Sequence, residues 1–399
     1  MRILIIHNYY QQPGGEDAAF SQEVALLRRH GFTVKTMEFT NDGFGRSLAG
    51  LVGGALKSLY NPVSARQVEE VIADFDPDVM HIHNLFYTAS PSVIQIARQW
   101  SVPVVMTLHN YRLVCNNGLL MRSSGTPCES CLSKTIPLDG IRHGCFRNSA
   151  LQSAQLTAIT SLHKLTGLWR SVDRYIVLTE FARRKILESS LNLTPEQVVV
   201  KPNSIAQANY VQAAPRADNF LYVGRLSSEK GISVLLDAAR MTDRRIDIVG
   251  DGPMRTAVEE LAASQPNLRY LGKLSQEQVR ERMRNCRALL VPSVWYEGLP
   301  TVILEAFASG TPVICSDQQN LNSIVRHGRT GHLFETGNAA SLATALQTIT
   351  DAQCARYGQA GLDQFNLTYT EQASLRQLSA IYASVQKKTY PIASDILLA

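Results

Sequence analysis

The sequence predicts an α/β protein built from two doubly wound parallel-sheet domains. The chain has 399 residues, 45% hydrophobic and 18% charged, and short β-branched runs alternate with helical patterns along its length. That length fits two or three domains, and the composition supplies the apolar surface that buried cores need. The alternation of strands and helices is typical of parallel sheets covered by helices.

In the first half of the chain, a helix is expected at Ala18–His30, where Phe20, Val24 and Leu27 share one face. The pattern breaks into a loop at 201–203. The expected strands of this half are Arg2–His7, Thr33–Glu38, Val79–His83, Val104–His109 and Arg174–Leu178.

A stretch rich in Ala, Gln and Asn at 206–219 is interpreted as a linker, and a second alternating series follows it. The last helical pattern, Glu371–Val385, is expected to cross back to the first domain. The predicted domains are therefore 1–203, 204–368 and a C-terminal helix in 369–399. The expected strands of the second half are Phe220–Val223, Arg245–Val249, Leu268–Leu271, Ala288–Pro292 and Pro312–Ser316.

Charge and hydropathy narrow the function classes. The net charge of +5 is modest and spread along the chain, which argues against a nucleic-acid binder. No apolar run reaches the roughly 18 residues that span a bilayer, and the run Ile3–Ile6 is too short for a signal peptide. We therefore expect a cytoplasmic protein. Two stretches without acids, 43–68 and 140–172, could face anionic lipid or an anionic acceptor, or form ordinary solvated helix faces.

The strongest motif is the segment 295–305, in which Glu297 and Glu305 are separated by seven residues. Pro300 suits the first turn of a helix, which places Glu297 in the preceding loop and Glu305 inside the helix. Free backbone N–H groups around Leu299–Val302 would then suit a phosphate. On one helix the two acids would lie roughly 12 Å apart, too far for the carboxylate pair of a glycosidase.

Three glycine-containing turns follow other expected strands. Gly224 begins the first, in which Arg225 and Lys230 bring two cations to the end of a strand and suit a diphosphate. Gly250 belongs to the second, between a strand and a helix. The third, 13–16, contains Gly14 and Gly15 and lets a ligand approach the backbone.

Together, in this order and spacing, these motifs resemble the family 4 glycosyltransferases of the GT-B fold, in which two Rossmann-like domains face each other across a cleft. The resemblance covers most of the chain and is densest from Phe220 to Leu333. It implies a retaining transferase that needs no bound metal, and it implies site residues by their match to the family's motifs. Arg225 and Lys230 would hold the donor diphosphate and stabilise its developing charge. Glu305 would bind the ribose and Glu297 the transferred sugar.

The resemblance assigns the remaining site residues in the same way. His109, in the sequence Thr-Leu-His-Asn after an expected strand, matches a histidine near the sugar. The implied catalytic residues are His109, Arg225, Lys230 and Glu297. The implied donor-binding residues are Gly14, Gly15, Gly224, Arg225, Lys230, Gly250, Lys273, Leu274, Glu297, Gly298, Leu299, Pro300, Thr301 and Glu305.

An insertion at about 112–147 departs from the family's minimal pattern and contains Cys115, Cys128, Cys131 and Cys145. Their spacing suits a structural Zn²⁺ site, with an iron–sulfur cluster as the minor option. Free thiols and disulfides are the alternatives. Because the insertion follows His109 directly, we expect it to shape the acceptor side.

Two further patterns have competing interpretations. His81 and His83 could form a metal pair on one strand face, but no carboxylate cluster accompanies them in the sequence, so we favour a strand-end interpretation with His83 near the ligand. The apolar stripe Leu156, Ile159, Leu162, Leu165 and Trp169 is interpreted as a buried helix face, with membrane docking as the alternative.

The sequence therefore predicts a glycosyltransferase that moves a sugar from a UDP- or GDP-sugar to an acceptor hydroxyl. The expected acceptor is a saccharide or lipid-linked saccharide of surface polysaccharide or glycolipid synthesis, with peripheral membrane contact and no nucleic-acid partner. The alternative is an inactive scaffold that binds nucleotide-sugars. A dehydrogenase is disfavoured because no G-x-G-x-x-G follows the first strand.

Overall fold

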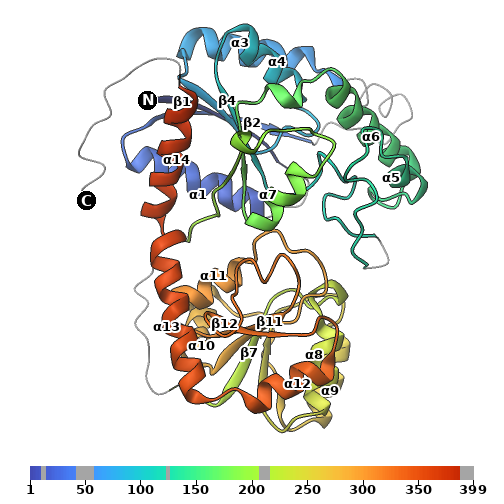
Figure 1. The fold of residues 1–399 in the computed structure, drawn as a ribbon, viewed down its shortest axis with the longest axis vertical. Coiled ribbons are helices and arrows are strands. Elements are labelled where there is room, and N and C mark those ends of the chain that lie inside the picture. Colours follow the sequence, from blue (N-terminus) through green and yellow to red (C-terminus); the bar gives the residue numbers. More distant parts are fainter. Residues whose placement is uncertain (10–14, 42–57, 123–125, 206–215, 387–399) are drawn as a thin grey trace. The chain divides into compact units, whose positions relative to one another are not determined.

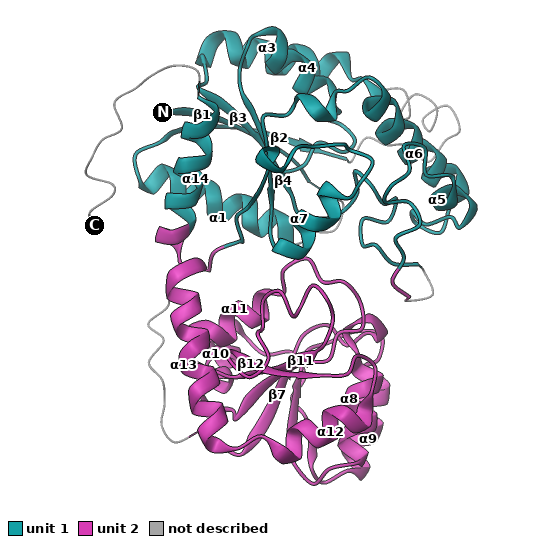
Figure 2. Cartoon of the chain, viewed as in Figure 1, with its two compact units in different colours: residues 1–122, 128–203, 374–399 teal, residues 123–127, 204–373 magenta. Residues whose placement is uncertain are grey.

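The structure is a computed structural model that describes residues 1–9, 15–41, 58–122, 126–205 and 216–386. The chain divides into two compact units (Figure 2): residues 1–122, 128–203 and 374–399 form unit 1, and residues 123–127 and 204–373 form unit 2. Each unit contains one six-stranded parallel sheet with helices packed on it (Figure 1). The predicted α/β class with two parallel sheets is therefore confirmed.

The sheet of unit 1 has the strand order β2-β1-β3-β4-β5-β6. The side chains of Ile3 to Ile6 in β1 are all fully buried, as expected for a parallel strand covered on both faces. The strands are β1 (Arg2–Tyr9), β2 (Thr33–Thr40), β3 (Val79–Ile82), β4 (Val104–Leu108), β5 (Arg174–Val177) and β6 (Val198–Val200).

One face of this sheet is covered by the first and the last helix of the chain. Phe20 and Leu27 of α1 and Leu378 and Tyr382 of α14 pack in one hydrophobic core with Ile3 of β1. The described helices of unit 1 are α1 (Gly15–Arg29), α3 (Pro62–Phe75), α4 (Ser92–Gln99), α5 (Leu138–Arg142), α6 (Ala150–Leu165), α7 (Glu180–Leu187) and most of α14 (Glu371–Val385).

The sheet of unit 2 has the order β12-β11-β10-β7-β8-β9. Alternate residues of its strands belong to two different cores: Phe220 and Tyr222 to one, and Leu221 to the other. Because successive side chains of a strand point to opposite faces, both faces of the sheet are covered. The strands are β7 (Asn219–Val223), β8 (Arg245–Val249), β9 (Leu268–Tyr270), β10 (Ala288–Val291), β11 (Val313–Ser316) and β12 (Gly331–Phe334).

The helices of unit 2 supply the covering layers. Leu235 of α8 and Leu342 of α12 lie in the first core, and Phe307 of α11 and Phe365 of α13 lie in the second. The helices are α8 (Ile232–Arg240), α9 (Arg255–Ser264), α10 (Gln276–Asn285), α11 (Thr301–Ala308), α12 (Ala339–Thr348) and α13 (Asp351–Thr368).

Sequence analysis missed two of the four edge strands, β6 and β12. β6 has three residues and β12 four, and both pair on one side only. Such short edge strands carry too little pattern to be told from a loop. The predicted linker falls largely on 206–215, outside the described residues.

The predicted apolar stripe, which runs from α6 into the turn that contains Trp169, splits in the structure. Leu156, Ile159 and Trp169 are fully buried, but Leu162 and Leu165 are exposed, so the expectation of one buried face was wrong for these two residues. The reason is geometric, since the stripe is wider than the helix face that packs inward. Among the described helices, none combines the length and apolar composition that crossing a bilayer requires.

Candidate functional site

A pocket of about 160 Å³ lies at the carboxyl edge of the unit 2 sheet, where β7 and β10 end. Ligands of open parallel sheets bind at this edge. The pocket brings together six of the predicted site residues, which follow these strands or lie at the start of α11. They are Gly224, Arg225, Lys230, Glu297, Pro300 and Thr301.

Lys230 and Glu297 form an ion pair in this pocket. The Nζ atom of Lys230 lies 2.7 Å from Oε1 and 2.8 Å from Oε2 of Glu297. Ser293 donates its hydroxyl to Oε1 of Glu297 at 2.7 Å, and Asn320 donates its amide to the backbone carbonyl of Glu297 at 2.8 Å. These contacts fix the loop between β10 and α11 and orient the buried carboxylate.

Trp295 adds a second contact to Lys230. The ammonium lies 5.2 Å from the centre of the Trp295 ring, within the range of a cation–π interaction. The indole Nε1 of Trp295 is buried without a hydrogen-bond partner. Arg225 is exposed at the pocket, so a guanidinium and an ammonium are both present where the resemblance places the diphosphate.

The glycine turns bring backbones into close contact at the same edge. Gly250 donates its N–H to the carbonyl of Gly272 at 3.0 Å, and a Cβ on Gly250 would lie 1.8 Å from the carbonyl oxygen of Gly224. With a φ of +145°, Gly250 also adopts a conformation that side chains rarely take. The turns after β7, β8 and β9 therefore depend on glycine at 250.

The start of α11 differs from the prediction by one residue. Pro300 is the N-cap with φ −67° and ψ 108°, and the helix begins at Thr301. Pro300 lies outside the first turn because its extended ψ starts the helix one position later. Gly298 and Leu299 are half-buried in the preceding loop, where Leu299 packs against the core.

Glu305 lies one turn into α11, and it does not line the pocket of Lys230. Burial raises the pKa of its half-buried carboxyl, and Arg280 partly opposes this effect. Leu274 is also not brought to this pocket, because its side chain lines another cavity with Asp247 and Arg282. Lys273 is exposed in the turn after β9.

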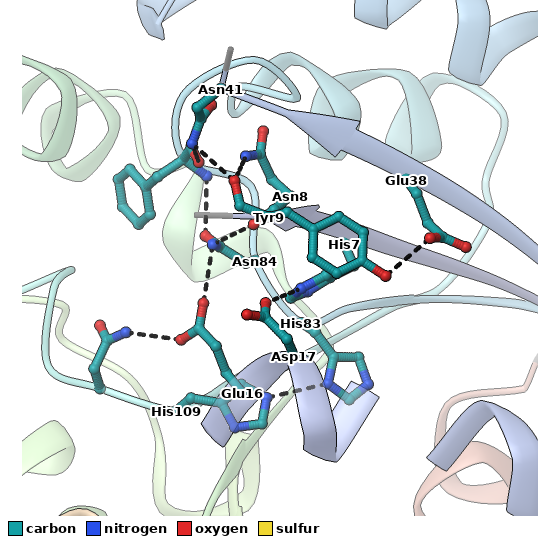
Figure 3. A network of polar contacts seen from close by, with 12 residues as sticks. His7, Asn8, Tyr9, Glu16, Asp17, Glu38, Asn41, His83, Asn84 and His109 are labelled. Atoms are coloured by element: carbon teal, nitrogen blue, oxygen red, sulfur yellow. Dashed lines mark hydrogen bonds and ion pairs between the residues drawn. The ribbon is translucent and has the colours of Figure 1, made fainter. Parts of the chain in front are cut away.

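His109 belongs to unit 1, where it follows β4. It lines a small cavity at the carboxyl edge of the sheet together with polar residues of its own segment, of α1 and of the segment after β3; Figure 3 shows contacts among these residues. Burial lowers the pKa of His109 well below its usual range, so the imidazole is neutral. The polar residues of this cavity are Glu16, His83, Asn84, Thr107, His109, Asn110 and Arg112.

Glu16 is held in this cavity by two amides. Asn84 donates to Oε1 at 3.1 Å and Asn110 donates to Oε2 at 3.2 Å (Figure 3). Burial raises the pKa of Glu16 to about 7, although Arg112 and the two amides favour the charged form. Gly15 begins α1 directly before Glu16, and Gly14 lies outside the described residues.

No disulfide joins the four cysteines of the insertion, which all lie in unit 1. Gly140 lies between the segments of two of these cysteines. Its carbonyl accepts the N–H of Cys145 at 3.0 Å, and a Cβ on Gly140 would lie 2.5 Å from the side chain of Asn116, which follows Cys115. The N–H of Cys128 bonds to the carbonyl of Leu120 at 2.8 Å. Burial raises the pKa of Cys115, while backbone N–H groups of 117–120 face its sulfur and favour the thiolate.

Sequence analysis missed Glu16, Asn84, Ser293 and Asn320 as site residues. Glu16 and Asn84 carried a usable signal in the sequence. Glu16 directly follows the pair Gly14 and Gly15, and Asn84 directly follows the expected strand Val79–His83. Ser293 likewise comes two residues after the end of β10. Asn320 carried none, since only the tertiary fold brings it to the Glu297 backbone.

Solved structures share this two-unit fold. The chain is similar to Alr3699/HepE from Anabaena, solved with UDP and glucose (TM-score 0.62, 17% identity, 96% of this chain and 100% of that one). It is equally similar to the lipopolysaccharide outer core galactosyltransferase WaaB in its apo form (TM-score 0.66, 16% identity, 96% and 100%). The fold and the two parallel sheets define the chain as a GT-B protein.

Sequence comparisons identify the family. Residues 18–204 match the family described as glycosyl transferase 4-like domain, and residues 211–362 match glycosyl transferases group 1. The phosphatidyl-myo-inositol mannosyltransferase of Mycobacterium leprae is 25% identical over 96% of this chain and 97% of that protein. The chain belongs to the family 4 glycosyltransferases of the GT-B fold, as its motifs predict.

Proposed function

We propose that this glycosyltransferase moves a hexose from a UDP- or GDP-sugar to a hydroxyl of a saccharide or lipid-linked saccharide. The proposal includes retention of the anomeric configuration and a transfer step that needs no metal. The observation that carries it is the pocket of unit 2, where Arg225, Lys230 and Glu297 meet at the carboxyl edge of β7 and β10.

Two cations in this pocket can replace a metal ion in stabilising a diphosphate leaving group. In the proposed step, the bond between the anomeric carbon and the phosphate oxygen breaks, and the electron pair stays on the diphosphate. The acceptor oxygen bonds to the anomeric carbon from the same face, and its proton passes to the departing phosphate oxygen. Arg225 and Lys230 neutralise the charge that develops there.

The contacts of Lys230 suggest how the pocket prepares for the donor. Without a donor its ammonium is neutralised by Glu297. A bound diphosphate would compete for Lys230, and Glu297 would then be available to accept hydrogen bonds from the hydroxyls of the transferred sugar. Glu305 on α11 carries a half-buried carboxyl that would accept the ribose hydroxyls.

An exposed apolar stripe on α6 supports a membrane-associated acceptor at the inner face of the membrane. Leu151, Leu162 and Leu165 are 64%, 43% and 64% exposed, and their spacing places them on one helix face. Arg142 and Arg147 are exposed nearby in the sequence, in the stretch without acids. Leucines with basic residues suit an anionic lipid surface. The mycobacterial relative is itself named for phosphatidyl-myo-inositol, a lipid.

For the cysteine loop we propose a structural metal, Zn²⁺, that folds the insertion without taking part in transfer. The backbone N–H groups that face the sulfur of Cys115 support it, because such donors stabilise thiolates. Ligation by all four sulfurs would require the loop to close further around the ion. Within the described residues, the group whose ligand atoms lie within 4.8 Å of one another is instead Glu23, His81 and His83.

The proposed function is tested by measuring nucleoside diphosphate release from a panel of UDP- and GDP-sugars, with and without saccharide acceptors. We expect release from one donor only when an acceptor hydroxyl is present, and an NMR coupling constant at the new linkage that shows retention. Donor binding without any acceptor-dependent release would favour the inactive scaffold instead.

A further inference from the structure

A buried chain of charged and polar side chains lies behind His109 in unit 1. Lys201 follows β6, Glu23 is on α1, His83 follows β3 and His109 follows β4. Lys201 Nζ lies 2.7 Å from Glu23 Oε2, and His83 Nε2 lies 3.1 Å from Glu23 Oε1. His83 Nδ1 lies 3.1 Å from His109 Nε2, and the two rings point toward each other (Figure 3).

Glu23 is the anchor of this chain because it is ionised. Burial alone would raise its pKa, but the Lys201 ammonium and the neighbouring imidazoles outweigh burial and hold the pKa well below the usual range. An ionised carboxylate only accepts hydrogen bonds. The Nε2 atom of His83 must therefore carry a hydrogen and donate it to Glu23.

The protonation of His83 then decides that of His109. Burial lowers the pKa of His83 to about 4, so the ring is neutral and holds one hydrogen. Since that hydrogen is on Nε2, the Nδ1 atom of His83 has a free lone pair and accepts a hydrogen bond. The hydrogen of the bond to His109 must come from His109 Nε2. The planes of the two rings differ by only 22°, which lets this N–H lie close to the plane of His83.

The same chain leaves one nitrogen of His109 for a ligand. His109 is neutral, so its ring nitrogens carry one hydrogen, and Nε2 donates this hydrogen in the bond to His83. Its Nδ1 is therefore an acceptor, and His109 lines the cavity that also holds Glu16 and Asn110. An acceptor nitrogen of this kind binds a hydroxyl hydrogen, as a sugar would offer.

A metal ion does not explain this cluster as well. Although the ligand atoms of Glu23, His81 and His83 lie within 4.8 Å of one another, the Lys201 ammonium already neutralises the carboxylate. His81 is occupied on both sides: Nδ1 lies 2.7 Å from the Tyr382 hydroxyl and 3.1 Å from Glu23 Oε1, and Nε2 lies 2.8 Å from the Thr107 hydroxyl.

We propose that His83 is a positioning residue that, through Glu23 and Lys201, fixes His109 as the Nε2–H tautomer, so that Nδ1 accepts a hydrogen bond from a sugar hydroxyl. The role in sugar binding rests on the proposed function, whereas the tautomer follows from the contacts of unit 1 alone. His83 and Glu23 act through His109.

The test uses the Glu23→Gln variant, whose amide has a defined orientation. Its oxygen must face the Lys201 ammonium, which turns its NH₂ group, with two hydrogens, toward His83 Nε2 and the neighbouring His81 Nδ1. His83 Nε2 then has to accept a hydrogen bond, so the hydrogen of His83 is on its Nδ1. His83 Nδ1 donates to His109 Nε2, and the hydrogen of His109 is therefore on His109 Nδ1. The matched control is Glu38→Gln, the same change at an exposed carboxyl that accepts from Tyr9.

The readout is the two-bond ¹H–¹⁵N correlation spectrum of the ¹⁵N-histidine-labelled full chain, with His109 assigned through His109→Gln. We expect Nε2–H in the wild type and in Glu38→Gln, and Nδ1–H in Glu23→Gln. A wild-type His109 with Nδ1–H, or an unchanged tautomer in folded Glu23→Gln, overturns the proposal.

Kinetics separate positioning from structure. We expect kcat/KM of Glu23→Gln to fall about tenfold to a hundredfold, as for a lost hydrogen bond in a site, with the affinity for the nucleoside diphosphate unchanged. A changed tautomer with wild-type kcat/KM overturns the positioning role. Absence of transfer in the wild type, with the expected tautomer, would count against the proposed function alone.

Discussion

Lys230 and Glu297 neutralise each other through two contacts, with the Nζ atom 2.7 and 2.8 Å from the two carboxylate oxygens. The side chain of Glu297 is 7% exposed and that of Lys230 is 27% exposed. A carboxylate buried this far needs a partner, because an uncompensated charge is costly away from water. The residue that we propose to bind the diphosphate therefore also stabilises the loop before α11.

Replacing Lys230 by alanine should affect both stability and transfer. The Lys230→Ala variant leaves the Glu297 carboxylate with the Ser293 hydroxyl, so we expect the free energy of unfolding to fall by about 1–3 kcal/mol. Transfer should fall at least about a hundredfold, because the leaving diphosphate loses a cation. Urea unfolding and initial rates measure the two effects.

Glu297→Gln and Lys35→Ala are the controls. Glu297→Gln keeps the size of the side chain and its contacts with Ser293, so it should lower transfer with a smaller loss of stability. Lys35 pairs with Asp74 at an exposed site, and Lys35→Ala should cost less than about 1 kcal/mol with full activity. Turnover of Lys230→Ala at the wild-type rate would refute the role of this residue.

Gly250→Ala should disrupt the nucleotide edge of unit 2. The added Cβ would meet the Gly224 carbonyl at 1.8 Å, so the turns after β7 and β8 must move apart. We expect no measurable binding of UDP or GDP by calorimetry. Gly328→Ala is the control, since Gly328 has a φ of +72° but a Cβ there would meet nothing within 4 Å. It should lose only about 1 kcal/mol, and equal effects of both substitutions would contradict the explanation by contact.

The fold was predictable because the central strands are apolar and regular. Phe220–Val223 and Ala288–Pro292 were expected within one residue of β7 and β10. Gly224 and Arg225 come directly after β7, so their place at the pocket followed from the strand itself. The edge strands β6 and β12 carried no comparable pattern.

The contacts within the sites were less predictable than the residues. Nothing in the spacing of Lys230 and Glu297 indicates that they pair, because they are 67 positions apart in the sequence. The sequence also could not link His83 to Glu23. His83 follows β3, Glu23 is on α1, and the two residues are 60 positions apart. Such pairs depend on how helices pack on the sheet, and this information is not local.

Glu16 should give unit 1 a pH-dependent stability. Its pKa in the folded chain is raised by burial from 4.5 to about 7, with Asp17 raising it further and Arg112 opposing. The native state therefore binds a proton more tightly, and stability falls as the pH rises from about 4.5 to 7. We expect Glu16→Gln to remove a fall of up to about 3 kcal/mol between these pH values, as measured by urea unfolding. The exposed-site control Glu70→Gln should keep this fall in stability. If the fall persists in Glu16→Gln, the pH dependence comes from another group.

The cysteine loop should contain one zinc ion per chain when the protein is purified without chelator. Elemental analysis of the wild type and of Cys131→Ser measures this, and the substitution should remove the metal because a structural site needs its full ligand set. Cys354→Ser, at a buried thiol of unit 2, should keep it. Metal-free wild type with four reactive thiols in the loop would support the free-thiol alternative.

The stripe on α6 should attach the protein to anionic membranes. Leu162 and Leu165 expose their apolar side chains, whereas Leu156 and Ile159 of the same helix are fully buried, so charged substitutions at 162 and 165 should not disturb the core. We expect the wild type to sediment with vesicles of phosphatidylglycerol and phosphatidylcholine, and Leu162→Glu/Leu165→Glu to bind at least about tenfold more weakly, because two leucines leave the lipid and two negative charges are added. Leu367 is 75% exposed on α13 of unit 2, and Leu367→Glu is the matched control that should bind like the wild type. An equal loss of vesicle binding in both variants would indicate a general effect of the added negative charge. Binding to neutral vesicles but not to anionic ones would contradict a contribution of Arg142 and Arg147 to membrane binding.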